Sequence, residues 1–158
     1  MKVLAVGCHP DDLEIACGGT LRKYVEQGAE VYMCHVANGC LGHVIIEPEE
    51  LRIIRTKEAE NAGAIIGAKQ VFNLDVPDLE INSHNLEVMD AMADVVRMVR
   101  PDVMITHNPD DYMPDHTAVS RLVFDASFTA TLPNYKSKYE KLNSHITWLE
   151  DEKIKKLC

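Results

Sequence analysis

Short apolar runs alternate with longer helical segments along this chain, and that alternation is the feature that most constrains its fold. The compact apolar runs are typical of buried parallel strands and cover residues 2–8, 30–37, 70–74 and 102–106. The segments with helical spacing follow them in turn, at residues 18–27, 49–66, 85–99 and 116–130. Strands joined by connections of helix length predict a parallel sheet covered by helices on both faces.

Right-handed crossovers favour the strand order 3-2-1-4 in such a sheet. The runs at residues 2–8 and 102–106 then become neighbours, although about a hundred residues separate them. Ligands bind in folds of this kind beyond the carboxyl ends of the strands, at the point where the strand order reverses. We therefore expect a Rossmann-like three-layer α/β/α fold with a mainly parallel sheet, which allows further strands, and a site between the loops that follow these two runs.

The length of 158 residues fits one domain, because domains usually run to about 100–150 residues. The last part of the chain, residues 132–158, is polar, rich in lysine and weakly periodic. It contains at most a short strand at residues 145–149. We expect a single domain over residues 1–158 whose C-terminal part is shortened or atypical.

The charge balance of 16 Lys and Arg against 25 Asp and Glu gives a net charge of −9. Such a charge repels phosphate backbones and anionic lipids, so nucleic acid and membranes are not expected partners. Five cysteines form an odd number at spacings that match no disulfide framework, and the apolar N-terminal run is too short for a signal peptide. Free thiols and a cytoplasmic location are the expected consequence.

Histidine and carboxylates gather in both loops that should face each other, residues 7–14 (GCHPDDLE) and 107–116 (HNPDDYMPDH). Zinc takes imidazole and carboxylate ligands, and catalytic zinc sites use three protein ligands. His9 and Asp12 are close enough in sequence to reach one ion together, and His116 is the best candidate for the third ligand. A neighbouring carboxylate could then serve as a general base.

Each loop also has an ordinary structural interpretation. A His-Pro-Asp sequence such as residues 9–11 is usually a turn, in which the proline fixes φ. Asp115 before a helix is an ordinary N-cap, and a pair such as residues 110–111 usually lies in solvent. Only the combination of two such loops at one predicted switch point favours a metal site.

Three motifs resemble the PIG-L/LmbE-like N-acetylglucosaminyl deacetylase family. Residues 3–21 (VLAVGCHPDDLEIACGGTL) resemble the signature in which His-Pro-Asp-Asp-x-Glu follows the first strand. Residues 55–59 (RTKEA) match an Arg-x-x-Glu-Ala helix, and residues 114–119 (PDHTAV) match a Pro-Asp-His-x-Ala motif. The matches run in the right order from residue 2 to about residue 130. The first motif is highly specific, the third is moderately specific, and the second is weak by itself.

The resemblance implies a zinc-dependent hydrolase that removes an N-acetyl group from an N-acetylglucosamine-type sugar or sugar conjugate. It implies His9, Asp12 and His116 as metal ligands, with zinc or another divalent ion bound, and Asp11 as the general base. Sequence spacing alone does not rank Asp11 against Asp12 for that role. The implied partner is a small N-acetylated sugar, and homo-oligomers are common in the family.

Further residues receive supporting roles, either from the resemblance or from their position in the chain. Glu14 and Asp115 are expected to be carboxylates that support the ligands. Arg55 either contacts substrate oxygens or forms an i,i+3 ion pair with Glu58, and the sequence favours neither. His43 lies in a Gly-rich loop at the ligand edge of the sheet, where it is expected to line the pocket.

Met113 departs from the family pattern, which commonly has histidine at that position. The usual histidine is thought to donate a hydrogen bond to the developing oxyanion, and methionine has no such donor. Tyr112 and His107 are candidates to replace it, although His107 fits a buried core histidine slightly better. Met113 therefore raises a rival hypothesis, a non-catalytic or diverged metal- or sugar-binding protein of the same fold. A nucleotide-binding domain is disfavoured because the first loop lacks the G-x-G-x-x-G sequence.

Overall fold

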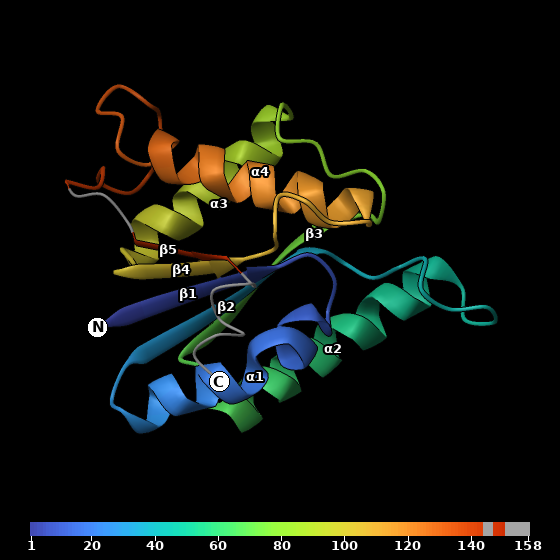
Figure 1. Ribbon diagram of the computed structural model, residues 1–158. Coiled ribbons are helices and arrows are strands. Elements are labelled where there is room, and N and C mark those ends of the chain that lie inside the picture. Colours follow the sequence, from blue (N-terminus) through green and yellow to red (C-terminus); the bar gives the residue numbers. More distant parts are fainter. Residues whose placement is uncertain (144–146, 151–158) are drawn as a thin grey trace.

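The computed structural model describes residues 1–143 and 147–150, and within them one parallel sheet is packed between two layers of helices (Figure 1). The strands are β1 (Lys2–Gly7), β2 (Glu30–Ala37), β3 (Gln70–Val76), β4 (Val103–Thr106) and β5 (Thr147–Glu150). The helices are α1 (Asp12–Glu26), α2 (Pro48–Ile66), α3 (Leu86–Val99) and α4 (Pro114–Thr129). The predicted alternation of strands and helices is confirmed.

The strand order is β3-β2-β1-β4-β5, with every pair parallel. The predicted 3-2-1-4 order is therefore confirmed, and β5 extends the sheet beside β4, close to the short strand expected at residues 145–149. Helices α1 and α2 cover one face of the sheet, and α3 and α4 cover the other (Figure 1). His145 and Cys158 lie outside the described residues.

Helix α1 differs most from its prediction, because it begins at Asp12 and not at residue 18. The prediction assigned residues 12–14 to the first loop and began the helix at Gly18, although glycine is a poor helix former. The segment from Asp12 is helical because it buries one stripe against the sheet through Leu13, Cys17 and Leu21. The other predicted elements lie within two residues of the observed bounds. The consequence is a very short first loop, confined to residues 8–11.

Side chains of the strands alternate between the two helical layers. In β1, Leu4 and Val6 belong to the core under α3 and α4, whereas Val3 and Ala5 belong to the core under α1 and α2. All four of these side chains are fully buried. A strand that is apolar on both faces is what the continuous run in the sequence predicted.

The segment after α4 packs against α3 through a buried arginine. The Arg97 guanidinium donates hydrogen bonds to backbone carbonyls on this segment, those of Ala130, Leu132, Tyr135 and Tyr139. Leu142 joins the core under α3 and α4. Although this part of the chain looked weakly periodic in sequence, residues 130–142 thus contribute to the core.

Strands β1 and β4 pair side by side, with Val3 opposite Val103 and Ala5 opposite Ile105. The loops after these strands therefore meet at one edge of the sheet, as predicted. Four cysteines of the described part are free thiols, Cys8, Cys17, Cys34 and Cys40. No helix among the described residues is long and apolar enough to cross a membrane.

Candidate active site

The loop after β1 is a tight turn that fixes its own side chains. The amides of Asp11 and Asp12 donate to the His9 carbonyl at 2.9 and 3.3 Å. The His9 amide in turn donates to Oδ2 of Asp12 at 2.6 Å. Because Asp12 also begins α1, its carboxylate is held between the turn and the helix.

The loop after β4 is longer and reaches the same edge of the sheet. His107, at the end of β4, accepts the Cys8 amide on Nε2 at 2.8 Å, which ties the two loops together. Further along, Oδ1 of Asp111 accepts the Met113 amide at 2.9 Å. Pro114 then starts α4, whose first turn presents Asp115 and His116.

Three histidines surround the carboxylate of Asp12. Oδ2 of Asp12 lies 3.5 Å from Nδ1 of His9 and 3.4 Å from Nε2 of His107. Oδ1 lies 3.4 Å from Nε2 of His116. The rings of His107 and His116 stack with centroids 4.0 Å apart. Asp12 is thus the carboxylate around which all three histidines gather.

His116 has one nitrogen in use and one free. Its Nδ1 donates to Oδ2 of Asp111 at 3.2 Å. Its Nε2 is buried, faces Asp12 and has no hydrogen-bond partner among the described residues. Histidine ligands of metals usually have this arrangement, in which one ring nitrogen donates to a carboxylate and the other is available to the metal.

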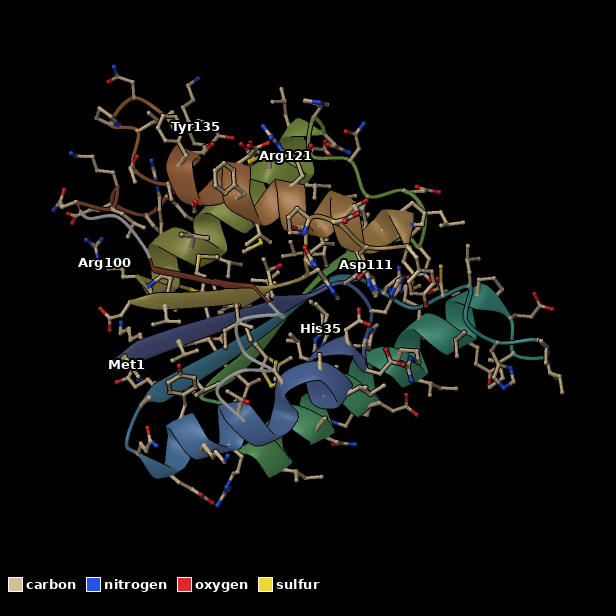
Figure 2. The ribbon with its side chains drawn as sticks, viewed as in Figure 1. Met1, His35, Arg100, Asp111, Arg121 and Tyr135 are labelled. Carbon is tan, nitrogen blue, oxygen red and sulfur yellow. The ribbon has the colours of Figure 1, made fainter. Side chains whose placement is uncertain are left out.

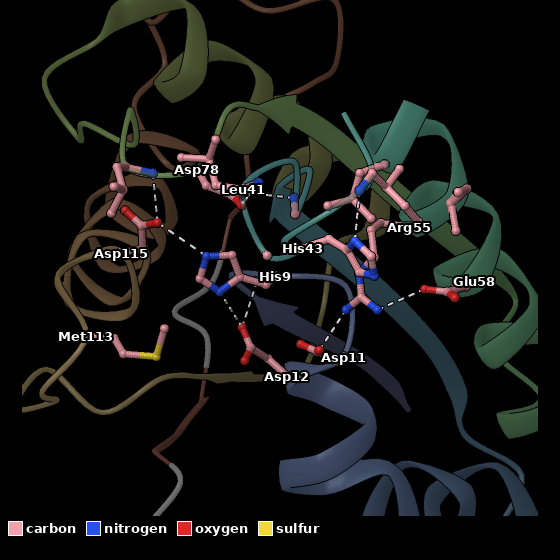
Figure 3. Close-up of a pocket in the computed structure, with 16 residues that line it drawn as sticks. His9, Asp11, Asp12, Leu41, His43, Arg55, Glu58, Asp78, Met113 and Asp115 are labelled. Carbon is pink, nitrogen blue, oxygen red and sulfur yellow. Dashed lines mark hydrogen bonds and ion pairs between the residues drawn. The ribbon is translucent and has the colours of Figure 1, made fainter. Parts of the chain in front are cut away.

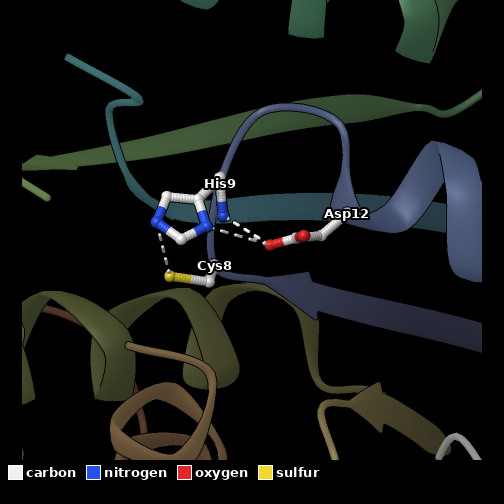
Figure 4. Close-up of side chains that lie close together, drawn as sticks. All are labelled: Cys8, His9 and Asp12. Carbon is white, nitrogen blue, oxygen red and sulfur yellow. Dashed lines mark hydrogen bonds and ion pairs between the residues drawn. The ribbon is translucent and has the colours of Figure 1, made fainter. Parts of the chain in front are cut away.

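His9 follows the same pattern with a different carboxylate. Its Nε2 lies 3.3 Å from Oδ2 of Asp115 and 3.6 Å from the sulfur of Cys8, while its Nδ1 faces Asp12 (Figures 3 and 4). Asp115 is almost fully buried. The structure therefore brings Asp115 next to a predicted ligand, as expected for a supporting carboxylate.

The charges of the cluster stabilise each other. Burial alone would raise the pKa of Asp12, but its contacts with His107 and His9 outweigh burial and hold that pKa well below its usual range. The contact with Asp12 raises the pKa of His9, against the opposing effect of burial. Burial and the nearby carboxylates of Asp115 and Asp12 raise the pKa of the Cys8 thiol. A cation would be favoured in this carboxylate-rich setting.

Two groups of side chains place their ligand atoms within 4.8 Å of one another, Asp12 with His107 and His116, and Cys8 with His9 and Asp12. Asp12 is common to both. The predicted trio of His9, Asp12 and His116 takes two members from each group. The donor chemistry, imidazole and carboxylate around an open buried nitrogen, fits a divalent metal such as zinc.

A cavity of about 710 Å³ opens beside this cluster (Figure 3). Of the predicted site residues, His9, Asp11, Asp12, His43, Arg55 and Asp115 line it. Met113 lines it as well. Tyr112 does not, and its side chain is 90% exposed, so the structure does not bring that hydroxyl to the site.

Arg55 forms the ion pair that the sequence left open, whereas its contact with substrate oxygens stays a prediction. Its Nη1 donates to Glu58 at 2.8 Å, which is the i,i+3 ion pair. Its Nη2 donates to Asp11 at 2.7 Å and also contacts the Pro10 carbonyl, and the side chain lines the cavity. Arg55 thus connects α2 to the turn that carries Asp11.

Glu14 lies away from the cavity, in the first turn of α1 under the sheet. Its Oε2 is 3.6 Å from Nε2 of His35, which is fully buried on the α1 and α2 side of the sheet (Figure 2). Neither side chain has a hydrogen-bond partner among the described residues. Glu14 therefore contacts His35 at the start of α1.

Sequence reasoning missed two carboxylates. Asp111 was interpreted as part of a solvated pair, yet it holds His116. Asp78, almost fully buried after β3, accepts the amides of Gly39 and Leu41 and so fixes the loop after β2. Its signal was available, because a carboxylate following a predicted parallel strand belongs to the ligand edge of the sheet.

Comparison with known proteins identifies the family. The family model described as PIG-L, GlcNAc-PI de-N-acetylase, matches residues 4–127. The chain belongs to this family. The resemblance drawn from the three motifs is therefore confirmed, and the matched region contains all the proposed ligands.

Relatives of known name agree with this assignment. A diacetylchitobiose deacetylase of Thermococcus kodakarensis is 31% identical over 141 residues, covering 85% of this chain and 52% of the relative. The N,N'-diacetylchitobiose deacetylase of Pyrococcus horikoshii superposes with a TM-score of 0.85 at 28% identity, covering 93% of this chain and 58% of that one. A 4-carboxy-2-hydroxymuconate hydratase of Pseudomonas putida shares the fold, with a TM-score of 0.80 at 24% identity over 90% of this chain and 62% of that one. The chain spans about half the length of the curated relatives that it matches.

Proposed function

We propose that this protein is a metal-dependent N-deacetylase that acts on an N-acetylglucosamine-type sugar or sugar conjugate. The observation that carries the proposal is the open, buried Nε2 of His116 facing Asp12, with the other nitrogen of the ring held by Asp111. Membership of the PIG-L family and the deacetylase relatives support the reaction class.

We assign the metal to His9, Asp12 and His116. His9 and His116 each direct one nitrogen at Asp12 and have the other next to a carboxylate. His107 differs, because its Nε2 lone pair already accepts the Cys8 amide. Zinc, or another divalent ion, would polarise the acetyl carbonyl and make water a nucleophile at neutral pH.

Asp11 is the proposed general base and acid. Its carboxylate lines the cavity at the mouth of the turn, where Arg55 holds it at 2.7 Å. In the first half of the reaction Asp11 takes a proton from the attacking water as the carbon–oxygen bond forms. In the second half the carbon–nitrogen bond breaks, Asp11 returns the proton to the amine, and acetate and the free amino sugar leave.

Release of acetate from N-acetylglucosamine and from N,N'-diacetylchitobiose tests the function directly. We expect turnover by the metal-loaded protein and a loss of about 10²–10⁴-fold in Asp11→Asn, because a positioned base contributes about that factor. Asp110→Asn, a change at an exposed aspartate of the second loop, is the matched control and should retain turnover. Metal bound tightly with no acetate from any N-acetylated sugar would favour the binding-protein hypothesis that Met113 raised.

A cytoplasmic location, a homo-oligomeric state and a single domain over residues 1–158 stay predictions from the sequence. The metal content of protein purified without added metal checks the choice of zinc.

A further inference from the structure

The cavity beside the metal cluster has two chemically different walls. The wall nearest Asp12 is polar and carries His9 and Asp115. The second wall is mainly apolar and comes from the loop after β2, from α2 and from the loop after β3, with Leu41, Ile46, Leu51, Ile54 and Leu79. It adjoins the first wall where the Leu79 amide donates to Asp115. Arg55 and Glu58 of α2 also line the cavity and pair with each other. A sugar bound with its acetamido group at the cluster would lie within reach of the second wall, because the Leu79 amide bonds to Asp115.

The polar groups among these apolar side chains are already engaged. Both carboxylate oxygens of Asp78 accept backbone amides, from Gly39 at 2.8 Å and from Leu41 at 2.8 Å. Nδ1 of His43 accepts two amides of its own loop. These bonds fix Asp78 and His43 on the loop backbone, and the five aliphatic side chains around them give this wall mainly apolar contact.

Two exposed leucines form the rim of this wall, and buried carboxylates fix both of them. Leu41 is 54% exposed and Leu79 is 69% exposed. The amide of Leu41 donates to Asp78, and the amide of Leu79 donates to Oδ2 of Asp115 at 2.9 Å. An exposed leucine alone is uninformative, but two of them held in place by buried charges at a cavity mouth call for a ligand.

Leu79 also has a strained backbone, with φ at 67°. A branched side chain rarely adopts this left-handed conformation, and such outliers concentrate at functional sites. The same Asp115 oxygen that holds the Leu79 amide also contacts His9. The rim is therefore positioned by a carboxylate of the metal cluster itself.

We propose that Leu41 and Leu79 form a subsite for an apolar group on the substrate, so that the preferred substrate is an N-acylated amino sugar with an alkyl or aromatic substituent. The inference rests on the proposed function and names the substrate class of that site. The apolar group could belong to the aglycone or to a longer N-acyl chain, because both supply the same chemistry.

Three ligands separate these sources: methyl N-acetylglucosaminide, hexyl N-acetylglucosaminide and methyl N-hexanoylglucosaminide. We expect at least one of the two compounds with a six-carbon chain to bind more tightly than methyl N-acetylglucosaminide. Its dissociation constant, measured by calorimetry on the metal-loaded protein, should be lower by a factor of about ten or more. KM values for release of the carboxylic acid should show the same ratio. The compound that binds more tightly shows whether the apolar group belongs to the aglycone or to the N-acyl chain.

The variants Leu41→Asn and Leu79→Asn, alone and combined, test the rim. Asparagine is close to leucine in size and tolerates a left-handed backbone, so the change removes mainly apolar character. We expect the hexyl-to-methyl preference to fall toward one. Leu86→Asn, at a leucine that is 73% exposed and lies outside the cavity lining, should leave the preference unchanged.

Equal affinity for all three ligands in the unmodified protein overturns the inference, as does a preference that survives in the double variant. If the double variant fails to fold, Leu41→Asn alone decides, because Leu41 has no strained φ. Absence of turnover with every substrate counts against the proposed function. The ratio of the dissociation constants still tests whether Leu41 and Leu79 form an apolar subsite.

Discussion

The two loops that build the candidate site hold their side chains by different means. The loop after β1 is local, because residues 8–11 form a turn whose hydrogen bonds join His9, Asp11 and Asp12 to one another. The loop after β4 adds a contact with a distant partner to its local ones. His107 reaches across to Cys8, and His116 is held by Asp111, five residues before it.

This difference explains how the site is divided between sequence and tertiary structure. The first loop positions Asp12 through hydrogen bonds with His9, which is only three residues away in sequence. The second loop can present His116 only if β4 lies beside β1, since His107 anchors it to the amide of Cys8. Asp12 contacts histidines of both loops. Substitutions in the two loops should therefore differ in how much they change metal affinity and turnover.

Asp12→Ala should have the largest effect, because it removes the one side chain that contacts His9, His107 and His116. We expect metal affinity to fall by more than the 10–100-fold typical of outer carboxylates, with turnover lost in parallel. Metal content by elemental analysis and acetate release measure the two effects. A variant that retained one metal per chain would show that Asp12 is not a ligand.

Met113→His should act in the opposite direction and comes next in size. The Met113 side chain lines the cavity at the start of α4 and has no hydrogen-bond donor. Because an oxyanion donor is typically worth about 10²–10³ in rate, we expect kcat to rise by up to that factor. Met113→Leu is the matched control, since it adds no donor. Equal kcat in both variants would mean that another group already supplies the hydrogen bond.

Asp111→Asn tests how far the second loop relies on its outer carboxylate. The substitution removes the carboxylate that accepts the hydrogen bond from His116 Nδ1, and metal affinity should fall by about 10–100-fold. The fold should be retained, because the Met113 amide can still donate to the asparagine oxygen. Asp110→Asn changes the adjacent exposed aspartate and should leave metal affinity as it is. Equal losses in both variants would point to a general charge effect.

Local patterns explain why so much of the fold was predictable. The apolar run at β1 and its partner at β4 each follow the rule for buried parallel strands, and the crossover rule then orders them. His9, Asp12 and His116 were predicted from two loops at one edge. The start of α1 was wrong because residues 12–14 were assigned to the first loop, although Leu13 and Cys17 continue the apolar stripe of the helix.

Contacts between distant segments explain what the sequence did not reveal. Asp78 and Leu79 follow β3, 39 and 36 residues from Gly39 and Asp115, and only the folded sheet brings them to these partners. Asp111 lies inside a loop that was already under consideration, but its direction depends on how α4 starts. The exposure of Tyr112 was hidden for the same reason.

His107→Phe gives the smallest expected effect on metal and the sharpest test of the ligand assignment. Phenylalanine keeps an aromatic ring next to His116 but removes the acceptor of the buried Cys8 amide. Leaving that donor unsatisfied should lower the free energy of unfolding by about 1–3 kcal/mol, as measured by chemical denaturation. Metal content should stay near that of the unmodified protein, whereas His116→Phe should abolish it. Loss of metal in His107→Phe, at a temperature where the variant is still folded, would identify His107 as the third ligand. His116 would then only stack on the His107 ring.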